Sequence, residues 1–188
     1  MLINMKYPLI RQRRISFSSL RDHNLIGSGK DGQVYHLKNG KCIKIYYNEA
    51  TQQKELQALK LGQSSSVIPR IYEAGYNYII LEYIESISLA RYIKRTNSLP
   101  FSLVKEIILL LDELQRVGFT RWDAEVRHIL ITKDGHLKVI DLKRALTSDT
   151  KVPTKLFQGL EKLGVLDLFF KHLRDLRPDL HLKWSSYQ

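Results

Sequence analysis

The stretch that decides the fold is LIGSGKDGQVYHLKNGKCIKIYY, residues 25–47. Three of its glycines have the spacing G-x-G-x-x-G: Gly27, Gly29 and Gly32. A short strand follows them and ends at Asn39-Gly40, the strongest short signal of a hairpin turn. A dinucleotide-binding loop would need a helix there, and a Walker loop would need lysine where Gln33 stands. Two interpretations remain: a hairpin that covers phosphate groups, or a glycine-rich turn without a ligand.

The composition is that of a folded domain. Hydrophobic residues make up 44% and charged residues 26% of the 188 residues, which is enough for one core or for two small lobes. Cys42 is the only cysteine, so an intramolecular disulfide and a cysteine metal cluster are excluded, and we expect a small core residue there. Apolar runs such as 107–111 are too short to span a membrane. We therefore expect a cytoplasmic protein without a membrane span.

The net charge of +11 favours polyanionic partners such as ATP, RNA or acidic protein surfaces. Part of it lies in residues 1–21, which hold no acid and the basic residues Lys6, Arg11, Arg13, Arg14 and Arg21. This basic arm is a candidate contact for an acidic partner or for RNA. A solvated tail is the plainer interpretation.

Strand patterns dominate up to residue 84, and helical patterns dominate after it. The first part is expected to hold one helix and two further strands, at 49–61, 70–74 and 78–83. The second part is expected to hold two helices and a hairpin around Asp134-Gly135, at 86–95, 102–118, 128–132 and 136–141. We expect Ser102 to cap the longer helix and Gly118 to end it. The predicted organisation is a basic arm at 1–21, a strand-rich lobe at 22–84 and a helical lobe at 85–188.

The order of these residues resembles the protein-kinase superfamily from about residue 25 to residue 146. Val34 stands two residues after the last glycine, as in the kinase loop G-x-G-x-x-G-x-V. Lys44 ends the strand KCIK and resembles the lysine of V-A-I-K, which pairs with the phosphates of ATP. Glu55 lies mid-helix, where the family has the glutamate that pairs with this lysine, and Glu49 is the competing choice.

The second part resembles the kinase catalytic machinery. FTRWDAEVRHILI, residues 119–131, resembles the catalytic loop H-R-D-x-x-x-x-N followed by a strand. The resemblance gives Asp123 as the aspartate that accepts the proton of the acceptor hydroxyl, and it places His128 at the metal-binding asparagine. Asp141, which follows Asp123 by 18 residues and His128 by 13, corresponds to the D-F-G aspartate that holds magnesium.

The resemblance implies an α+β, two-lobed protein-kinase-like fold with an antiparallel-sheet N-lobe containing one helix and a reduced, mainly helical C-lobe. Glu82 and Ile84 lie where the family's hinge offers backbone groups to adenine. The implied function is transfer of the γ-phosphoryl group of ATP to a serine or threonine hydroxyl of a protein. The implied cofactors are ATP and Mg²⁺, with Mn²⁺ as an alternative because of His128.

Several positions depart from the kinase pattern. They are Arg121 and Trp122 in place of the His and Arg of H-R-D, Glu125 in place of a lysine, His128, and Asp141-Leu142-Lys143 in place of D-F-G. Glu125 would weaken phosphoryl transfer unless Arg121 or Arg127 compensates for its charge. Only 47 residues follow Asp141, without an A-P-E motif, so the C-lobe resembles that of the small atypical RIO-type and Kdo kinases. Two alternatives stay open: a small-molecule (sugar-type) kinase, and a non-catalytic nucleotide-binding pseudokinase or scaffold.

Overall fold

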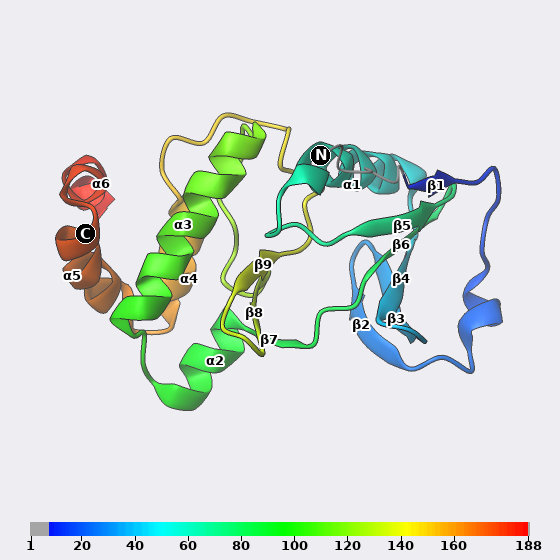
Figure 1. The fold of residues 1–188 in the computed structure, drawn as a ribbon, viewed down its shortest axis with the longest axis horizontal. Coiled ribbons are helices and arrows are strands. Elements are labelled where there is room, and N and C mark those ends of the chain that lie inside the picture. Colours follow the sequence, from blue (N-terminus) through cyan, green and yellow to red (C-terminus); the bar gives the residue numbers. More distant parts are fainter. Residues whose placement is uncertain (1–7, 188) are drawn as a thin grey trace, which may run out of the picture.

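The computed structural model describes residues 8–187 as a six-stranded sheet with one long helix, followed by a mainly helical part (Figure 1). Residues 1–7, and with them Lys6 of the predicted arm, lie outside the described residues, as does Gln188. The first part consists of β1 (Leu9–Ile10), the 3₁₀ helix η1 (Phe17–Leu20), β2 (Leu25–Gly29), β3 (Gly32–Leu37), β4 (Lys41–Tyr46), α1 (Glu49–Leu61), η2 (Gly62–Ser64), β5 (Ile71–Ala74) and β6 (Tyr78–Glu82). The second part consists of β7 (Ser86–Ser88), α2 (Leu89–Thr96), α3 (Phe101–Val117), β8 (Ile129–Thr132), β9 (Leu137–Val139), α4 (Thr154–Lys162), α5 (Leu166–Leu176), α6 (Pro178–Trp184) and η3 (Ser185–Tyr187). This is the expected α+β, two-lobed kinase-like fold.

The larger sheet has the strand order β1-β5-β6-β4-β3-β2. All neighbouring strands pair antiparallel except β1, which pairs parallel with β5. The β3–β4 hairpin turns at Asn39 and Gly40, whose φ angles of 61° and 66° suit the tight hairpin turn expected from this dipeptide. The expected antiparallel sheet is therefore confirmed, and a parallel edge strand is added to it.

Helix α1 packs against β4, β5 and β6 and has the predicted bounds. The side chain of Asn48 accepts a hydrogen bond from the backbone N–H of Thr51 at 3.2 Å and so caps the first turn. The buried side of the helix carries Leu56 and Leu59, together with the carboxyl group of Glu55. A carboxylate in such a position needs a charged or hydrogen-bonding partner, and the partner belongs to the site described below.

The start of the helical part differs from the prediction. Residues 86–88 form strand β7, which pairs with β8, and helix α2 begins only at Leu89. The side chain of Ser88 accepts a hydrogen bond from the backbone N–H of Arg91 at 3.3 Å and caps α2. A three-residue strand followed directly by a capped helix has too few residues to show a period of its own.

Helix α3 forms the centre of the helical part and contacts α5 and β9. It begins at Phe101, so Ser102 lies inside the helix and is not its cap, which corrects the prediction. It ends at Gly118, whose φ of 96° gives the expected left-handed C-terminal residue. Among the helices of residues 8–187, none is both long and apolar enough to cross a membrane.

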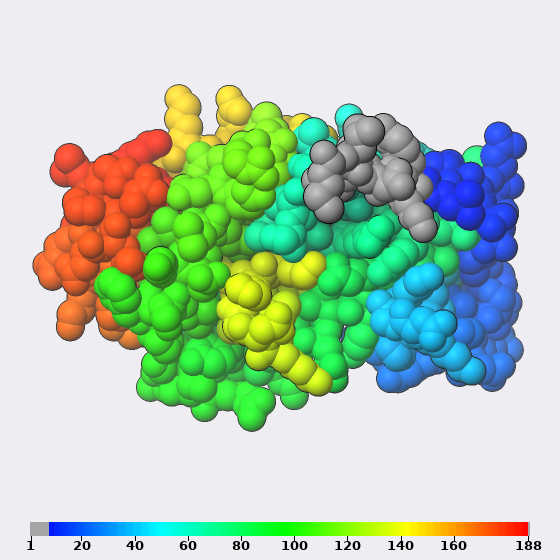
Figure 2. Space-filling view, viewed as in Figure 1, coloured from blue at the N-terminus to red at the C-terminus, as the bar shows by residue number. Residues whose placement is uncertain are grey.

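Residues 8–21 of the predicted arm lie against the strand-rich part, at the end of the molecule opposite the C-terminal helices (Figure 2). Arg11 Nε and Arg13 Nη2 lie 3.1 Å and 2.9 Å from the Glu73 carboxylate, and Arg14 pairs with Glu49. These arginines have acidic partners within the chain, which reduces the charge that the arm presents to RNA or to an acidic protein.

Candidate active site

All the predicted site residues line one cavity of about 910 Å³ between the two parts. They are Gly27, Gly29, Gly32 and Val34 of the glycine-rich hairpin, followed by Lys44, Glu55, Glu82, Ile84, Asp123, His128 and Asp141. The volume lies within the usual range for small-molecule sites, which is roughly 300–1,000 Å³. The fold therefore brings residues from distant parts of the sequence to one candidate active site.

The glycine-rich hairpin of β2 and β3 forms one wall of the cavity. A Cβ atom at Gly32 would lie 1.9 Å from the backbone oxygen of Ile45 on β4, so no other residue fits there without a shift of the sheet. A Cβ atom at Gly29 would meet nothing within 4 Å. Gly32 therefore serves strand packing, whereas Gly29 leaves open space in a loop that lines the cavity.

Lys44 reaches the cavity from β4, where it lies opposite Val34 of β3 and Ile79 of β6. Its Nζ atom is 2.6 Å from Oε2 of Glu55, and the two side chains are only 14% and 3% exposed. Burial raises the pKa of Glu55, while the charge and hydrogen bond of Lys44 oppose this shift. Glu49 pairs with Arg14 instead. The geometry thus joins Lys44 to Glu55, as expected, and not to Glu49.

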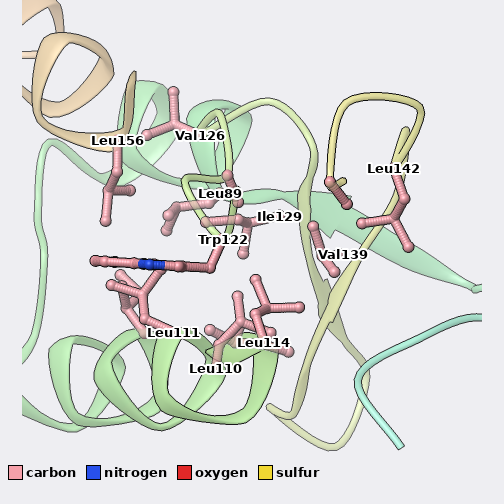
Figure 3. Packing of buried hydrophobic residues seen from close by; sticks show 14 of the residues in the cluster. Leu89, Leu110, Leu111, Leu114, Trp122, Val126, Ile129, Val139, Leu142 and Leu156 are labelled. Atoms are coloured by element: carbon pink, nitrogen blue, oxygen red, sulfur yellow. The ribbon is translucent and has the colours of Figure 1, made fainter. Parts of the chain in front are cut away.

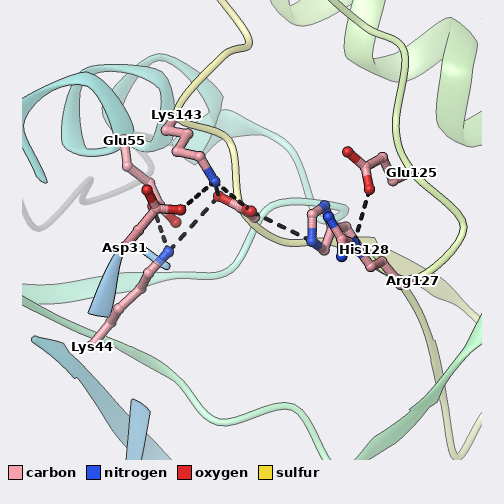
Figure 4. Close-up of polar contacts among 8 residues, drawn as sticks. Asp31, Lys44, Glu55, Glu125, Arg127, His128 and Lys143 are labelled. Atoms are coloured by element: carbon pink, nitrogen blue, oxygen red, sulfur yellow. Dashed lines mark hydrogen bonds and ion pairs between the residues drawn. The ribbon is translucent and has the colours of Figure 1, made fainter. Parts of the chain in front are cut away.

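Three basic side chains surround the carboxylate of Asp141, namely Lys143, Lys44 and His128, which Figure 4 labels. Lys143 Nζ is 2.6 Å and 2.7 Å from its two carboxylate oxygens, Lys44 Nζ is 3.9 Å away, and His128 Nε2 is 3.4 Å away. Burial acts to raise the pKa of Asp141, but the hydrogen bonds from Lys143 and the nearby cations bring it below its usual value. Asp141 is therefore an ionised oxygen donor, the kind of ligand that a hard divalent cation prefers.

His128 is held beside Asp141 by backbone hydrogen bonds. Its N–H donates to the Glu125 carbonyl at 2.8 Å, and its own carbonyl accepts from the Ile140 N–H at 3.0 Å. Burial lowers the pKa of the His128 imidazole, and the neighbouring carboxylates only partly offset this effect. The neutral form is favoured, and that is the form which binds a metal.

Asp123 binds the start of helix α4. Its carboxylate accepts hydrogen bonds from the backbone N–H groups of Lys155 and Leu156 at 2.9–3.1 Å and from the Thr154 hydroxyl at 3.3 Å. It thus caps α4 from a loop 31 residues earlier in the chain. Burial raises the pKa of Asp123, and the backbone hydrogen bonds act in the opposite direction.

Trp122 anchors the loop that carries Asp123. The indole ring is 6% exposed and lies among apolar side chains that include Leu89, Leu111 and Leu156 (Figure 3). Trp122 stands where the kinase pattern has the arginine of H-R-D, so an apolar anchor replaces a charged one. The loop is held by core packing on one side and by the capping of α4 on the other.

Comparison with known proteins identifies related sequences over most of the chain. "Putative serine/threonine-protein kinase YrzF" of Bacillus subtilis is 24% identical over 149 residues, covering 74% of this chain and 69% of that protein. Human receptor-interacting serine/threonine-protein kinase 1 is 26% identical over 74% of this chain, and the catalytic subunit of cAMP-dependent protein kinase from Dictyostelium discoideum is 28% identical over 70%. These similarities to serine/threonine protein kinases, at 24–28% identity over 70–74% of the chain, support a protein-kinase-like superfamily. No protein-family model matches it.

This kinase-like chain spans only 23% of the length of the human and Dictyostelium kinases that it matches. The two predicted hinge residues, Glu82 and Ile84, differ in the hydrogen bonds of their backbone N–H groups. The backbone N–H of Glu82 already donates to the Arg70 carbonyl at 2.9 Å, and its side chain binds Lys138. Within residues 8–187, the N–H of Ile84 donates no hydrogen bond. Of the two hinge residues, Ile84 therefore has the free backbone donor.

Two charged residues of the kinase-like site were not predicted from the sequence. Asp31 lies at the tip of the glycine-rich hairpin, and its Oδ2 is 2.8 Å from Nζ of Lys143. Lys143 stood out in the sequence only as a departure from the glycine of D-F-G. The position of Lys143 directly after Asp141-Leu142 was the available signal, because a lysine two residues from a carboxylate can reach it. The charge of Glu125 is balanced by Arg127, whose Nε is 2.8 Å away, as one of the two expected compensations.

Proposed function

We propose that the chain is an ATP-dependent phosphotransferase that transfers the γ-phosphoryl group to a hydroxyl, with serine or threonine of a protein as the acceptor. The observation that carries this proposal is the meeting of the Lys44–Glu55 ion pair, Asp141 and Asp123 in one cavity beneath a glycine-rich hairpin. The similarity to named serine/threonine kinases supports the same reaction class. A cytoplasmic location stays a prediction.

Each group would have a distinct task in this reaction. Lys44, oriented by Glu55, would contact phosphate oxygens of ATP, and the Gly29 region of the hairpin would cover them. The backbone N–H of Ile84 would donate to adenine. Asp123 would orient the acceptor hydroxyl and receive its proton.

The described residues offer a divalent cation a small set of ligands. Residues 8–187 contain no group of three or more His, Cys, Asp or Glu side chains placed to hold a metal. Asp141 and His128 nevertheless fit one cation, since Mg²⁺ commonly takes one or two protein carboxylates and completes its shell with phosphate oxygens and water. Such a cation would supply charge neutralisation at the phosphates.

Two observations favour a second candidate, a non-catalytic nucleotide-binding pseudokinase. Both oxygens of Asp141 are bonded to Lys143, and the Asp123 carboxylate is bonded to the start of α4. A scaffold would use these bonds as permanent structure. An enzyme whose metal takes the face of Asp141 that Lys143 occupies, or whose acceptor hydroxyl takes an occupied position on Asp123, would exchange one of these bonds during each reaction cycle.

The test is incubation of the purified protein with labelled ATP and Mg²⁺ or Mn²⁺, with and without a generic protein substrate, followed by mapping of the label. Transfer that is lost in Lys44→Met and Asp123→Asn but retained in Lys133→Gln, outside the cavity, supports the enzyme. ATP binding without transfer in the parent protein supports the pseudokinase. Absence of both with either metal refutes the proposed function.

A further inference from the structure

Lys143 joins two carboxylates that come from different parts of the chain. Its Nζ atom lies 2.6 Å and 2.7 Å from the two oxygens of Asp141 and 2.8 Å from Oδ2 of Asp31. Asp31 belongs to the tip between β2 and β3, whereas Asp141 follows β9. A single ammonium group therefore ties the hairpin above the cavity to the opposite wall (Figure 4).

This arrangement differs from an ordinary surface ion pair. Lys143, Asp141 and Asp31 are 20%, 18% and 28% exposed, while the pair of Lys133 and Glu85 is 71% and 65% exposed. Partly buried charge pairs are screened less by solvent and salt than exposed ones. The contacts of Lys143 with Asp141 and Asp31 are therefore weakened less by solvent and salt than the exposed pair of Lys133 and Glu85.

The same contacts have a chemical consequence for Asp141. A divalent cation would bind the carboxylate oxygens that accept hydrogen bonds from Lys143. An ammonium group at hydrogen-bond distance and a metal ion at about 2.1 Å cannot both take the same face of these oxygens. A cation that binds both oxygens on this face can enter only when the Lys143 side chain leaves Asp141.

We propose that Lys143 is a resident cation of the nucleotide site, which neutralises Asp141 and ties down the glycine-rich hairpin through Asp31 until a divalent cation displaces it. Lys143 is a positioning residue in this scheme. The inference rests on the proposed function, because it concerns the order in which metal and nucleotide occupy the same site. It predicts that removing the ammonium group strengthens metal binding, which is the opposite of what loss of a ligand would do.

The first experiment measures binding of Mn²⁺ alone by electron paramagnetic resonance, without nucleotide and without turnover. Lys143→Gln should bind Mn²⁺ at least about tenfold more tightly than the parent protein, which corresponds to about 1.4 kcal/mol. Lys133→Gln removes an equivalent charge outside the cavity and should bind as the parent does. Lys143→Met, which keeps the aliphatic stem, serves as a second variant if Lys143→Gln does not fold.

The second experiment measures deuterium uptake of peptides that cover residues 26–34. Lys143→Gln and Asp31→Asn should both raise uptake, because each frees the hairpin from the opposite wall. Only Lys143→Gln should also tighten Mn²⁺ binding, because Asp31→Asn leaves the ammonium group on Asp141. This split separates the tie to the hairpin from the competition for Asp141.

Equal or weaker Mn²⁺ binding in both Lys143 variants overturns the inference. Absence of Mn²⁺ binding in all proteins also overturns it, since removal of the ammonium group should reveal the site. Failure of the proposed function has a different signature, namely no thermal stabilisation by ATP in the parent or in any variant. The two failures are therefore distinguishable.

Discussion

Replacement of Lys44 by methionine tests the electrostatics of the site directly. Lys44 and Glu55 form an ion pair with an Nζ–Oε2 distance of 2.6 Å, and both side chains are little exposed. At an effective dielectric constant of about 20, two unit charges at this distance attract by about 6 kcal/mol before desolvation is counted. Breaking a buried pair by removing one partner costs about 3–5 kcal/mol, because the other charge is left uncompensated. For a chain of this size that corresponds to a fall in Tm of roughly 6–20 °C.

The loss of stability in Lys44→Met should increase as the pH rises. The pKa of Glu55 is already raised by burial, and Lys44→Met removes the ammonium group that opposes this shift. An acid whose pKa is raised in the folded state is most stabilising below its unfolded pKa, and this contribution disappears as the pH rises through the folded pKa. Lys44→Met should therefore lose little stability near pH 5 and most of the predicted amount at pH 8.

The assay is urea unfolding of parent and variants at both pH values. Lys44→Met/Glu55→Met should recover most of the loss, because an apolar pair leaves no buried charge. Lys133→Met breaks the pair with Glu85, which has a similar distance of 2.7 Å but is exposed, and should cost less than about 1 kcal/mol. A loss that is equal at pH 5 and pH 8, or that the double variant does not relieve, would refute the reasoning.

Three further predictions concern other walls of the cavity. Asp123→Asn should abolish phosphoryl transfer while ATP still raises Tm. Asp123→Ala should in addition lower the free energy of unfolding by about 0.5–2 kcal/mol, because the cap of α4 is lost. Unchanged transfer in Asp123→Asn would show that the loop is misassigned. Gly32→Ala should destabilise by more than about 3 kcal/mol because of the contact with strand β4, whereas Gly29→Ala should be nearly neutral, as urea unfolding can check. His128→Asn should shift the metal preference from Mn²⁺ towards Mg²⁺ in ATP binding, and an identical preference in both proteins would remove His128 from the site.

Much of the strand-rich part was predictable because its signals are local. The Asn39-Gly40 turn and the uninterrupted helix at 49–61 are each fixed by neighbouring residues, and both have the predicted bounds. Strand β1 was missed, since two residues show no period. Ser102 was misjudged as a cap because the helix starts two residues earlier than such a cap requires, with Pro100 at the cap position and Phe101 as its first residue.

In the candidate site too, contacts that a known sequence pattern describes were predicted, and contacts between residues far apart in the sequence were not. The pairing of Lys44 with Glu55 was predicted because the resemblance to kinases gives a strand lysine followed by a mid-helix glutamate, and this order can be read along the sequence. The contact between Asp31 and Lys143 joins residues more than one hundred positions apart, and no pattern of spacing encodes it. The capping of α4 by Asp123 is hidden for the same reason, because it depends on how the chain after Asp141 turns back.

The bonds of Asp123 set a condition on any acceptor. A carboxylate has about four lone-pair positions, and Asp123 makes four contacts: two from the Lys155 N–H, one from the Leu156 N–H and one from the Thr154 hydroxyl. The three backbone contacts are 2.9–3.1 Å long and belong to the helix start, whereas the Thr154 contact is the longest at 3.3 Å and comes from a side chain that can rotate. In the proposed reaction, an acceptor hydroxyl would therefore reach Asp123 by replacing the hydroxyl of Thr154. Since this group sits at the first residue of α4, the start of α4 is where the protein would distinguish one acceptor from another.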